Sequence, residues 1–322
     1  MSAFRAAGAS RYGRCKLKRR NLSAHTETYV APPSALHYML QAFRPSSGWN
    51  PDRGFPDLNV TWRDYHIEPQ VMQFLQLING IQDPRSQELL SLLFPHVTGF
   101  RLLMTMLTHP LWPLPIWGAL QVRNRLSMHR PLRADDTSDL IARVAGWRVL
   151  EKGIEVDLHT RLQRGDDCAW ESVVTFYYRG RFGSSTEHGA ALGAAPISPV
   201  LDVHSTKAEE WRINGSGRWR FGALTGDYNG IHQWDWYARR FGFAAAFPHP
   251  QRVAAQCLGH LHSSGSVPLH LDLWIKGPVY FGSEVIQRVS PLVDDECQDF
   301  ALWIAGDERP ALVGSLHNAV SA

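Results

Sequence analysis

The chain has 322 residues, of which 44% are hydrophobic, 11% aromatic and 20% charged, with a formal net charge of +3. This composition is that of a packed globular protein, and it excludes collagen-like, low-complexity and wholly disordered chains. The length suits one large domain or two domains of roughly 130–150 residues. Four scattered cysteines form no CxxC pair, which excludes a disulfide scaffold and zinc-ribbon spacing and predicts a reducing, cytoplasmic location. They are Cys15, Cys168, Cys257 and Cys297.

The first 28 residues carry the excess positive charge. They contain seven Lys or Arg residues and one acid, Glu27, for a net charge of +6, which leaves the rest of the chain at −3. The segment lacks the apolar run of a secretory signal, so we predict that 1–28 is a disordered extension. Nucleic-acid binding needs basic residues combined with aromatic residues on a folded face, and the tail does not predict it.

One stretch has the polarity of a membrane span. Between Arg101 and Arg123 there is no Asp, Glu, Lys or Arg, and about 20 apolar residues suffice to cross a bilayer. Three prolines interrupt the stretch, however, and proline removes a helix hydrogen bond and clashes with the preceding turn. We therefore predict a buried helix, a proline turn and the start of a strand, with no membrane span.

A repeated triplet indicates an internal duplication. Phe94-Pro95-His96 reappears as Phe247-Pro248-His249, 153 residues later. Apolar residues at helical spacing follow each triplet, and a strand-like segment and a proline come next. The strand-like segments are Leu120–Leu126 and Leu271–Gly277. The matched order predicts two homologous domains.

Longer strands are predicted beyond these segments. From Ile154 to Gln163 apolar and polar residues alternate, which is typical of a sheet with one wet face. The second half has strand patterns at 285–289, 300–304 and 312–316. A single apolar helix is buried well by a curved antiparallel sheet that wraps around the helix. We therefore predict an α+β fold with one such unit per half. The predicted boundaries are an N-terminal domain at 29–182, a linker at 183–208 and a C-terminal domain at 209–322.

The densest group of polar residues lies just before the second triplet. Taken alone, Asp227 and His232 favour a turn carboxylate that caps the following helix and a structural histidine. Their surroundings, however, resemble the motif of the MaoC-like or (R)-specific enoyl-CoA hydratase family, which implies a double hot-dog fold for the duplicated chain. The positions at the family spacing are Gly226, Asp227, Asn229, His232, Ala238, Gly242, Phe243 and His249.

The resemblance implies a chemistry for these residues. Hydration of an α,β-unsaturated thioester needs a base that takes a proton from water and a proton that returns at C2. By resemblance, Asp227 and His232 grip that water, while Asn229 and Gly226 support the loop. Negative charge develops on the thioester oxygen, and the N-terminus of the following helix offers N–H donors to it.

The chain departs from the family at Pro250, where the family has a glycine whose N–H contributes to the oxyanion site. Proline has no N–H, although it is favoured in a first helical turn. The remaining candidates for this role are His249, Gln251 and Arg252. Loss of one such donor typically costs about 10²–10³ in rate, so a slow enzyme, a shifted pocket and a binding role all stay open.

Other segments have weaker signals. The first half lacks the Asp/His pair, and by resemblance its apolar stretch 102–117 is a candidate wall of an acyl tunnel, with core packing as the alternative. Lys276 and Arg252 are candidates for the phosphates of a CoA or phosphopantetheine arm, against the alternative of solvated surface charges. His260 and His262 have no Cys or acidic partner at ligand spacing, so no metal site is predicted.

We predict an enzyme that reversibly hydrates a trans-2-enoyl thioester to a 3-hydroxyacyl thioester, with (R) stereochemistry implied by the resemblance alone. The partner is an acyl-CoA or acyl-carrier-protein thioester, so CoA or phosphopantetheine enters with the substrate and no separate cofactor is expected. The alternatives are a non-catalytic acyl-thioester-binding protein and a hot-dog thioesterase. Because two fused halves can satisfy the usual hot-dog dimer within one chain, a monomer or a homodimer is expected.

Overall fold

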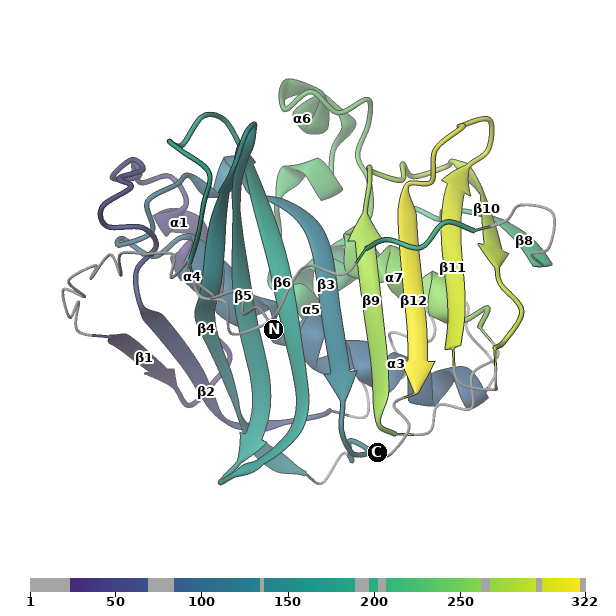
Figure 1. Ribbon diagram of the computed structural model, residues 1–322, viewed down its shortest axis with the longest axis horizontal. Coiled ribbons are helices and arrows are strands. Elements are labelled where there is room, and N and C mark those ends of the chain that lie inside the picture. The colour runs from purple at the N-terminus through teal and green to yellow at the C-terminus, as the bar shows by residue number, and fades with distance from the viewer. Residues whose placement is uncertain are drawn as a thin grey trace, which may run out of the picture.

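The computed structural model describes residues 24–68, 84–133, 136–188, 197–201, 207–261, 267–293 and 297–318. Each half of the chain contributes strands and helices to one α+β body (Figure 1). The elements of the first half are β1 His25–Tyr29, α1 Ala35–Gln41, β2 Leu58–His66, α3 Pro84–Thr98, α4 Phe100–Leu107, η1 Ile116–Gly118, β3 Leu120–Met128, β4 Thr137–Leu150, β5 Gly153–Arg164, β6 Asp167–Arg179 and β7 Thr186–His188. Those of the second half are β8 Lys207–Arg212, α5 Arg218–Thr225, η3 Gly230–His232, α6 Asp235–Arg240, α7 Pro250–Leu258, β9 Leu269–Ile275, β10 Glu284–Val289, β11 Cys297–Ile304 and β12 Leu312–Asn318.

One continuous sheet joins the two halves. Its order is β1-β2-β4-β5-β6-β3-β9-β12-β11-β10-β8, and β7 pairs with the part of β4 beyond β2. The halves meet where β3 and β9 pair antiparallel, with Leu126 opposite Leu271. Both of these leucines are fully buried. The predicted strands are therefore confirmed, and the two strand-like segments that echo one another are neighbours in space.

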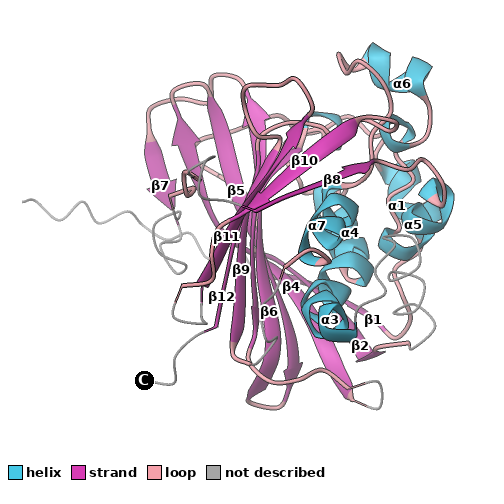
Figure 2. Cartoon of the chain, turned by 90° about the vertical axis from the view of Figure 1, so that its right-hand side faces the viewer, coloured by secondary structure: helices cyan, strands magenta, loops and turns pink. Residues whose placement is uncertain are grey.

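The helices cover one face of this sheet (Figure 2). In α4 every residue except Arg101 is buried, because the segment is apolar on all sides and lies between the sheet and the other helices. The helix α3 packs against α7, so the long helices of the two halves share one core. This arrangement confirms the predicted buried helix, proline turn and strand between Arg101 and Arg123.

The two repeated triplets hold different places in the fold. Phe247-Pro248-His249 directly precedes α7, as predicted, whereas Phe94-Pro95-His96 lies inside α3. The first-half helix extends backward through its triplet because buried leucines at helical spacing precede it. The predicted helix after the first triplet is thus the end of α3 followed by α4.

The alternation along β5 is confirmed on its apolar face, where Ile154, Val156 and Leu158 are fully buried. The opposite face is less exposed than expected. His159 is 4% exposed there because its Nε2 lies 2.8 Å from Glu171 Oε2 on the neighbouring strand β6. On the same face Arg148 of β4 pairs with Glu155 and Asp157 of β5.

Two predicted boundaries need correction. Strand β1 includes the last residues of the predicted extension 1–28, because 25–29 pairs with β2, while 1–23 lies outside the described residues. Strand β7 falls within the predicted linker 183–208, and β8 begins at Lys207 rather than after 208. Within the described part of the linker, Leu201 packs against Trp274, Ala301 and Val313 on the sheet face away from the helices.

The described residues contain one helical stretch that is long and apolar enough to cross a membrane, Leu89–Leu107. Most of this stretch is buried inside the fold. It is the core helix pair α3 and α4 described above.

The seam between the halves predicts a stability effect. Leu126→Ala should lower the free energy of unfolding by about 2–5 kcal/mol, because it removes fully buried methyl groups and leaves a cavity at the β3–β9 seam. Leu150→Ala, at a strand leucine that is 37% exposed, should change it by only about 0.5 kcal/mol. Urea unfolding of the two variants checks this expectation. Equal effects would contradict the view that the seam belongs to the cooperative core.

Candidate active site

The motif residues lie on a loop between α5 and α6. Helix α5 ends at Thr225, and Gly226 follows with φ +73° in the left-handed region, which is the usual way for glycine to end a helix. Asn229 then accepts a hydrogen bond from the Ile231 N–H at 3.2 Å and caps the short helix η3, which ends at His232. The loop therefore places Asp227 and His232 on either side of a capped turn.

Asp227 is buried and held through almost every polar atom it has. Its N–H donates to Thr225 Oγ1 at 3.1 Å, and its Oδ1 accepts from the Asn229 N–H at 3.0 Å. Its carbonyl oxygen accepts from His249 Nε2 at 3.0 Å. The remaining oxygen, Oδ2, lies 3.6 Å from both His232 Nε2 and His249 Nε2, which is too long for a hydrogen bond. Asp227 thus presents one uncommitted carboxylate oxygen.

The hydrogen bonds of the two histidines fix where their protons lie. His232 Nδ1 lies 2.8 Å from the Phe247 carbonyl oxygen, which can only accept, so this nitrogen carries a proton and, in the neutral ring, Nε2 presents a lone pair. His249 Nε2 is protonated for the same reason, since it donates to the Asp227 carbonyl. The two rings stack with centroids 3.8 Å apart. Asp227 Oδ2 and His232 Nε2 are therefore two acceptors facing one another.

The surroundings of Asp227 and His249 shift the pKa values of both side chains. Burial raises the pKa of the Asp227 carboxyl, but His232 and His249 in their protonated forms, together with the Asn229 N–H, outweigh burial and bring the pKa to about 2. Burial, together with the neighbouring His232, lowers the pKa of His249 to about 3. Asp227 therefore stays ionised and His249 stays neutral.

A cavity of about 400 Å³ opens in front of this pair. Its lining from the second half includes Asp227, His232 and the apolar Phe247, and the first half adds the apolar Phe100, Met104 and Leu107. The two helical halves thus build one pocket. The acid/base groups come from one half, and much of the apolar surface comes from the other.

The segment 102–117, predicted as a tunnel wall or as core, contributes residues to both the cavity wall and the core. Met104, Leu107 and Ile116 line the cavity, whereas Leu102 and Leu103 belong to the core. A helix that lies between a sheet and a pocket has to show one stripe of side chains to each.

Two exposed cations stand on the lining of the cavity where it meets solvent. Lys276 is one of the predicted phosphate-arm residues, and it follows β9. Arg179, at the end of β6, was missed by the sequence analysis. Its only signal in the sequence is a cation at the end of a predicted strand, and the sequence pattern does not show that this strand end reaches the pocket.

The start of α7 bears on the oxyanion candidates. Pro250 occupies the first helical position and lines the cavity, so the N–H of the family glycine is missing there. Gln251 also lines the cavity, and no acceptor for its backbone N–H is found in the described part of the chain. Its side-chain amide is buried with both polar atoms unpartnered among the same residues. The ring N–H of His249 is already committed to the Asp227 carbonyl.

Arg252 does not fit either predicted role. Its backbone N–H donates to the His249 carbonyl at 2.9 Å. Its side chain is 1% exposed, and its guanidinium donates to the Asn214 carbonyl at 3.1 Å and lies over Phe281. The residue points away from the pocket because α7 turns it into the core, so the predictions of an oxyanion donor and a phosphate contact are wrong for Arg252.

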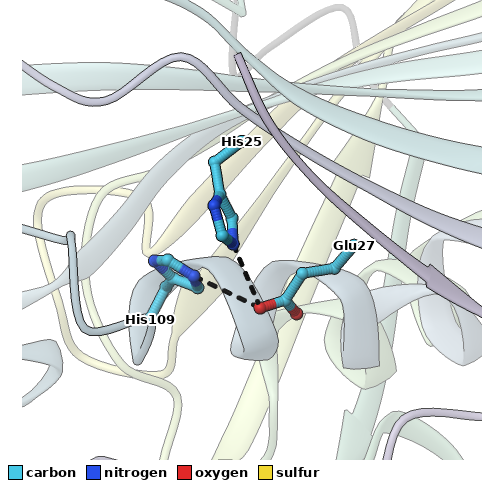
Figure 3. A group of neighbouring side chains, drawn as sticks. All are labelled: His25, Glu27 and His109. Atoms are coloured by element: carbon cyan, nitrogen blue, oxygen red, sulfur yellow. Dashed lines mark ion pairs between the residues drawn. The ribbon is translucent and has the colours of Figure 1, made fainter. Parts of the chain in front are cut away.

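Two clusters outside the pocket have metal-ligand residue types. In Figure 3, His25, Glu27 and His109 converge, with His109 Nε2 3.2 Å from Glu27 Oε1. His109 Nδ1 accepts a hydrogen bond from the Leu111 N–H at 3.1 Å, so the ring proton is on Nε2, the nitrogen that faces Glu27. The other cluster consists of His129, Cys168 and Glu171, with His129 Nε2 3.1 Å from Glu171 Oε1.

The predicted absence of a metal site at His260 and His262 remains a prediction. His260 stacks on Trp211 with ring centroids 4.6 Å apart. His262 lies outside the described residues. The structure therefore does not test the pair.

The fold is the double hot-dog fold found in solved MaoC-like dehydratases, which confirms the predicted fold class and agrees with the resemblance. The MaoC-like dehydratase of Phytophthora capsici superimposes with a TM-score of 0.69 at 15% identity, over 84% of this chain and 98% of its own. A protein of Mycobacterium tuberculosis described as having a double hot-dog fold gives a TM-score of 0.50 at 14% identity, over 80% of this chain and 94% of its own.

The sequence is similar to a particular enzyme of this class. The curated 3-hydroxyacyl-thioester dehydratase X of Mycobacterium tuberculosis is 27% identical over 235 residues, which cover 73% of this chain and 81% of that protein. A crystal structure of this enzyme, HtdX, gives a TM-score of 0.64 and covers 81% of this chain and 100% of its own. No protein-family model matches the chain.

The lowered pKa of Asp227 predicts how stability depends on pH. Its folded-state pKa of about 2 lies below the ordinary aspartate value of 3.8, so the carboxylate stabilises the fold above pH 4 and loses this effect as pH falls toward 2. Between pH 5 and pH 3, wild type should lose about 1 kcal/mol more free energy of unfolding than Asp227→Asn. Urea titrations of both proteins at the two pH values measure this difference. The same pH dependence in both would contradict an ionised, stabilised Asp227.

Proposed function

We propose that the protein is an acyl-thioester hydro-lyase that interconverts a trans-2-enoyl thioester and a 3-hydroxyacyl thioester. The observation that carries the proposal is the pair Asp227 Oδ2 and His232 Nε2, two acceptors 3.6 Å apart on the lining of a largely apolar pocket. A single water molecule has two protons to donate and fits such a pair. The similarity to a dehydratase of 3-hydroxyacyl thioesters supports the same reaction.

The reaction follows from this arrangement. In the hydration direction a water held by Asp227 and His232 attacks C3 of the enoyl group while one of its protons passes to the pair. A proton then returns from the pair to C2, so that water has added across the double bond and both residues regain their starting states. In dehydration the same steps run backward. The resemblance to the family supports the (R) product, with the pair on one face of the substrate.

Negative charge on the thioester oxygen needs a donor that is already in place. We assign this role to Gln251, whose backbone N–H and side-chain amide are both free of partners in the described residues and both belong to a residue that lines the pocket. The positive end of the α7 dipole adds to their effect. Pro250 occupies the family position and contributes shape but no donor.

The substrate arm is proposed to leave the pocket past Lys276 and Arg179, whose exposed cations suit the phosphates of CoA or phosphopantetheine. The acyl partner is therefore a CoA or carrier-protein thioester. The proposed chemistry uses only proton transfer, so it requires no metal or redox cofactor beyond the substrate's own carrier.

One chain is proposed to be the functional unit, because the β3–β9 seam joins two hot-dog units into one sheet. A cytoplasmic location is supported by Cys168, Cys257 and Cys297, the three cysteines of the described chain, which are unpaired. Both points are parts of the proposal.

Asp227→Asn should abolish turnover. The amide can still accept from the Asn229 N–H, so the loop is expected to keep its shape, but the carboxylate that takes the proton is gone. We expect kcat for crotonyl-CoA to fall by at least about 10³-fold, with acyl-CoA binding nearly unchanged. Loss of enoyl absorbance and release of free thiol are followed together.

A matched control is Asp272→Asn. Asp272 is also buried and ion-paired, with Arg125 Nε 2.9 Å away, but it lies outside the pocket, and its variant should turn over like wild type. Enoyl loss without thiol release in wild type supports the hydro-lyase. Thiol release would instead indicate a thioesterase, and binding without either reaction would indicate a binding protein. Wild-type turnover in Asp227→Asn would refute its catalytic role.

Pro250→Gly tests the start of α7. It restores an N–H at the family position, and it should lower stability by about 0.4–1 kcal/mol because glycine is less restrained in the unfolded chain. A donor that acts mainly in the transition state should raise kcat about tenfold and change KM less. Steady-state kinetics with crotonyl-CoA measure both constants. An unchanged kcat in a folded variant would show that the thioester oxygen is held elsewhere.

A further inference from the structure

The loop that carries Asp227 is tied to the first half of the chain by a buried tyrosine. Tyr38 of α1 is 1% exposed, and its hydroxyl donates to the Gly226 carbonyl oxygen at 2.6 Å. Burial raises the pKa of the Tyr38 phenol, so the hydroxyl keeps its proton and remains a donor. This bond crosses from the half without acid/base groups to the residue directly before Asp227.

The bond fixes one end of a single peptide plane. The carbonyl of Gly226 is held by Tyr38, and the N–H of the same peptide, which belongs to Asp227, is held by Thr225 Oγ1 at 3.1 Å. A peptide unit is rigid, so holding it at both ends restricts the backbone rotation that would swing Asp227. The contact is also tight, because a Cβ on Gly226 would lie 2.0 Å from Tyr38 Oη.

A second tie comes from Arg101 of α4. Its Nη2 donates to the Ala223 carbonyl at 2.5 Å, in the last turn of α5, where carbonyl groups lack helical partners and a cation is favourable. Arg101 is the one residue of α4 that is not buried, while its neighbours Phe100 and Met104 line the cavity. The same helix therefore forms part of the pocket wall and holds the end of the helix before the loop.

We infer that Tyr38 and Arg101 are positioning residues for the acid/base pair, through which the first half sets the direction of Asp227 Oδ2. Neither residue lines the cavity, so neither touches the substrate. The inference rests on the proposed hydro-lyase activity and adds a role for the first half beyond its apolar wall. It follows from the geometry of Asp227, whose backbone and Oδ1 are all held, so that only the orientation of the loop decides where Oδ2 points.

The size of the effect can be anticipated. Misplacing a catalytic group by 1 Å can cost about 10²-fold in rate. Removing one of several ties should displace Asp227 by less than that. We expect Tyr38→Phe, which deletes only the hydroxyl, to lower kcat for crotonyl-CoA about tenfold and to change KM less than about twofold.

The matched control is Tyr65→Phe. Tyr65 is equally buried in the first half. Its hydroxyl lies 2.6 Å from Thr98 Oγ1, and neither residue belongs to the motif loop. It should lose stability by a similar amount, measured as the shift in Tm, but it should keep wild-type kcat. Arg101→Met, which retains the aliphatic stem, should resemble Tyr38→Phe in the kinetics.

A pH profile separates positioning from general destabilisation. If the loop loosens, Asp227 moves away from the histidines that hold its pKa down, so the acid limb of kcat/KM should move to higher pH in Tyr38→Phe and stay in place in Tyr65→Phe. Wild-type kcat and an unmoved acid limb in folded Tyr38→Phe and Arg101→Met would overturn the inference. A different result would contradict the proposed function and not this inference. In that case wild type would fail to hydrate crotonyl-CoA, while Asp227→Asn would still change acyl-CoA binding.

Discussion

Asp227 has to remain ionised while it is buried beside two imidazoles, and the surrounding structure meets this requirement. A buried carboxylate is costly unless its oxygens are hydrogen-bonded or faced by positive dipoles. Here Oδ1 is used by the turn, the backbone is held on both sides, and one oxygen is left free for chemistry. The end of α5, the cap of η3 and the residue before α7 each supply one partner to Asp227, through Thr225, Asn229 and His249.

The two halves of the chain contribute unequally to the pocket. Both halves contribute a central helix and strands to one sheet, and they meet at β3 and β9. Only the second half has the carboxylate and imidazole, whereas the first supplies Phe100 and Met104 to the pocket. The pocket is therefore a property of the fused chain, since residues of both halves line it.

Local patterns in the sequence predicted local structure well. Period-two alternation along 154–163, the helical spacing after each triplet and the spacing of the motif depend on neighbouring residues, and these features agree with the structure. What failed or was missed depends on distant residues. Burial of His159 needs Glu171, and the hydrogen bond of Tyr38 needs Gly226 far along the chain. Burial of Arg252 needs the Asn214 carbonyl and the Phe281 ring. No periodicity encodes such contacts.

The first triplet has a consequence for how this chain could change. His249 precedes a helix and reaches the Asp227 loop, whereas His96 sits within α3, buried, with its Nε2 3.3 Å from Asn124 Nδ2 of β3. Because α3 runs straight through its triplet, the first half has no exposed helix start at the equivalent place. Transplanting the Asp-x-Asn-x-x-His letters into the first half would therefore not create a second reaction centre. Helix α3 would first have to be interrupted at its triplet. The interruption would disturb the packing of the buried α3 leucines in the core that the two halves share.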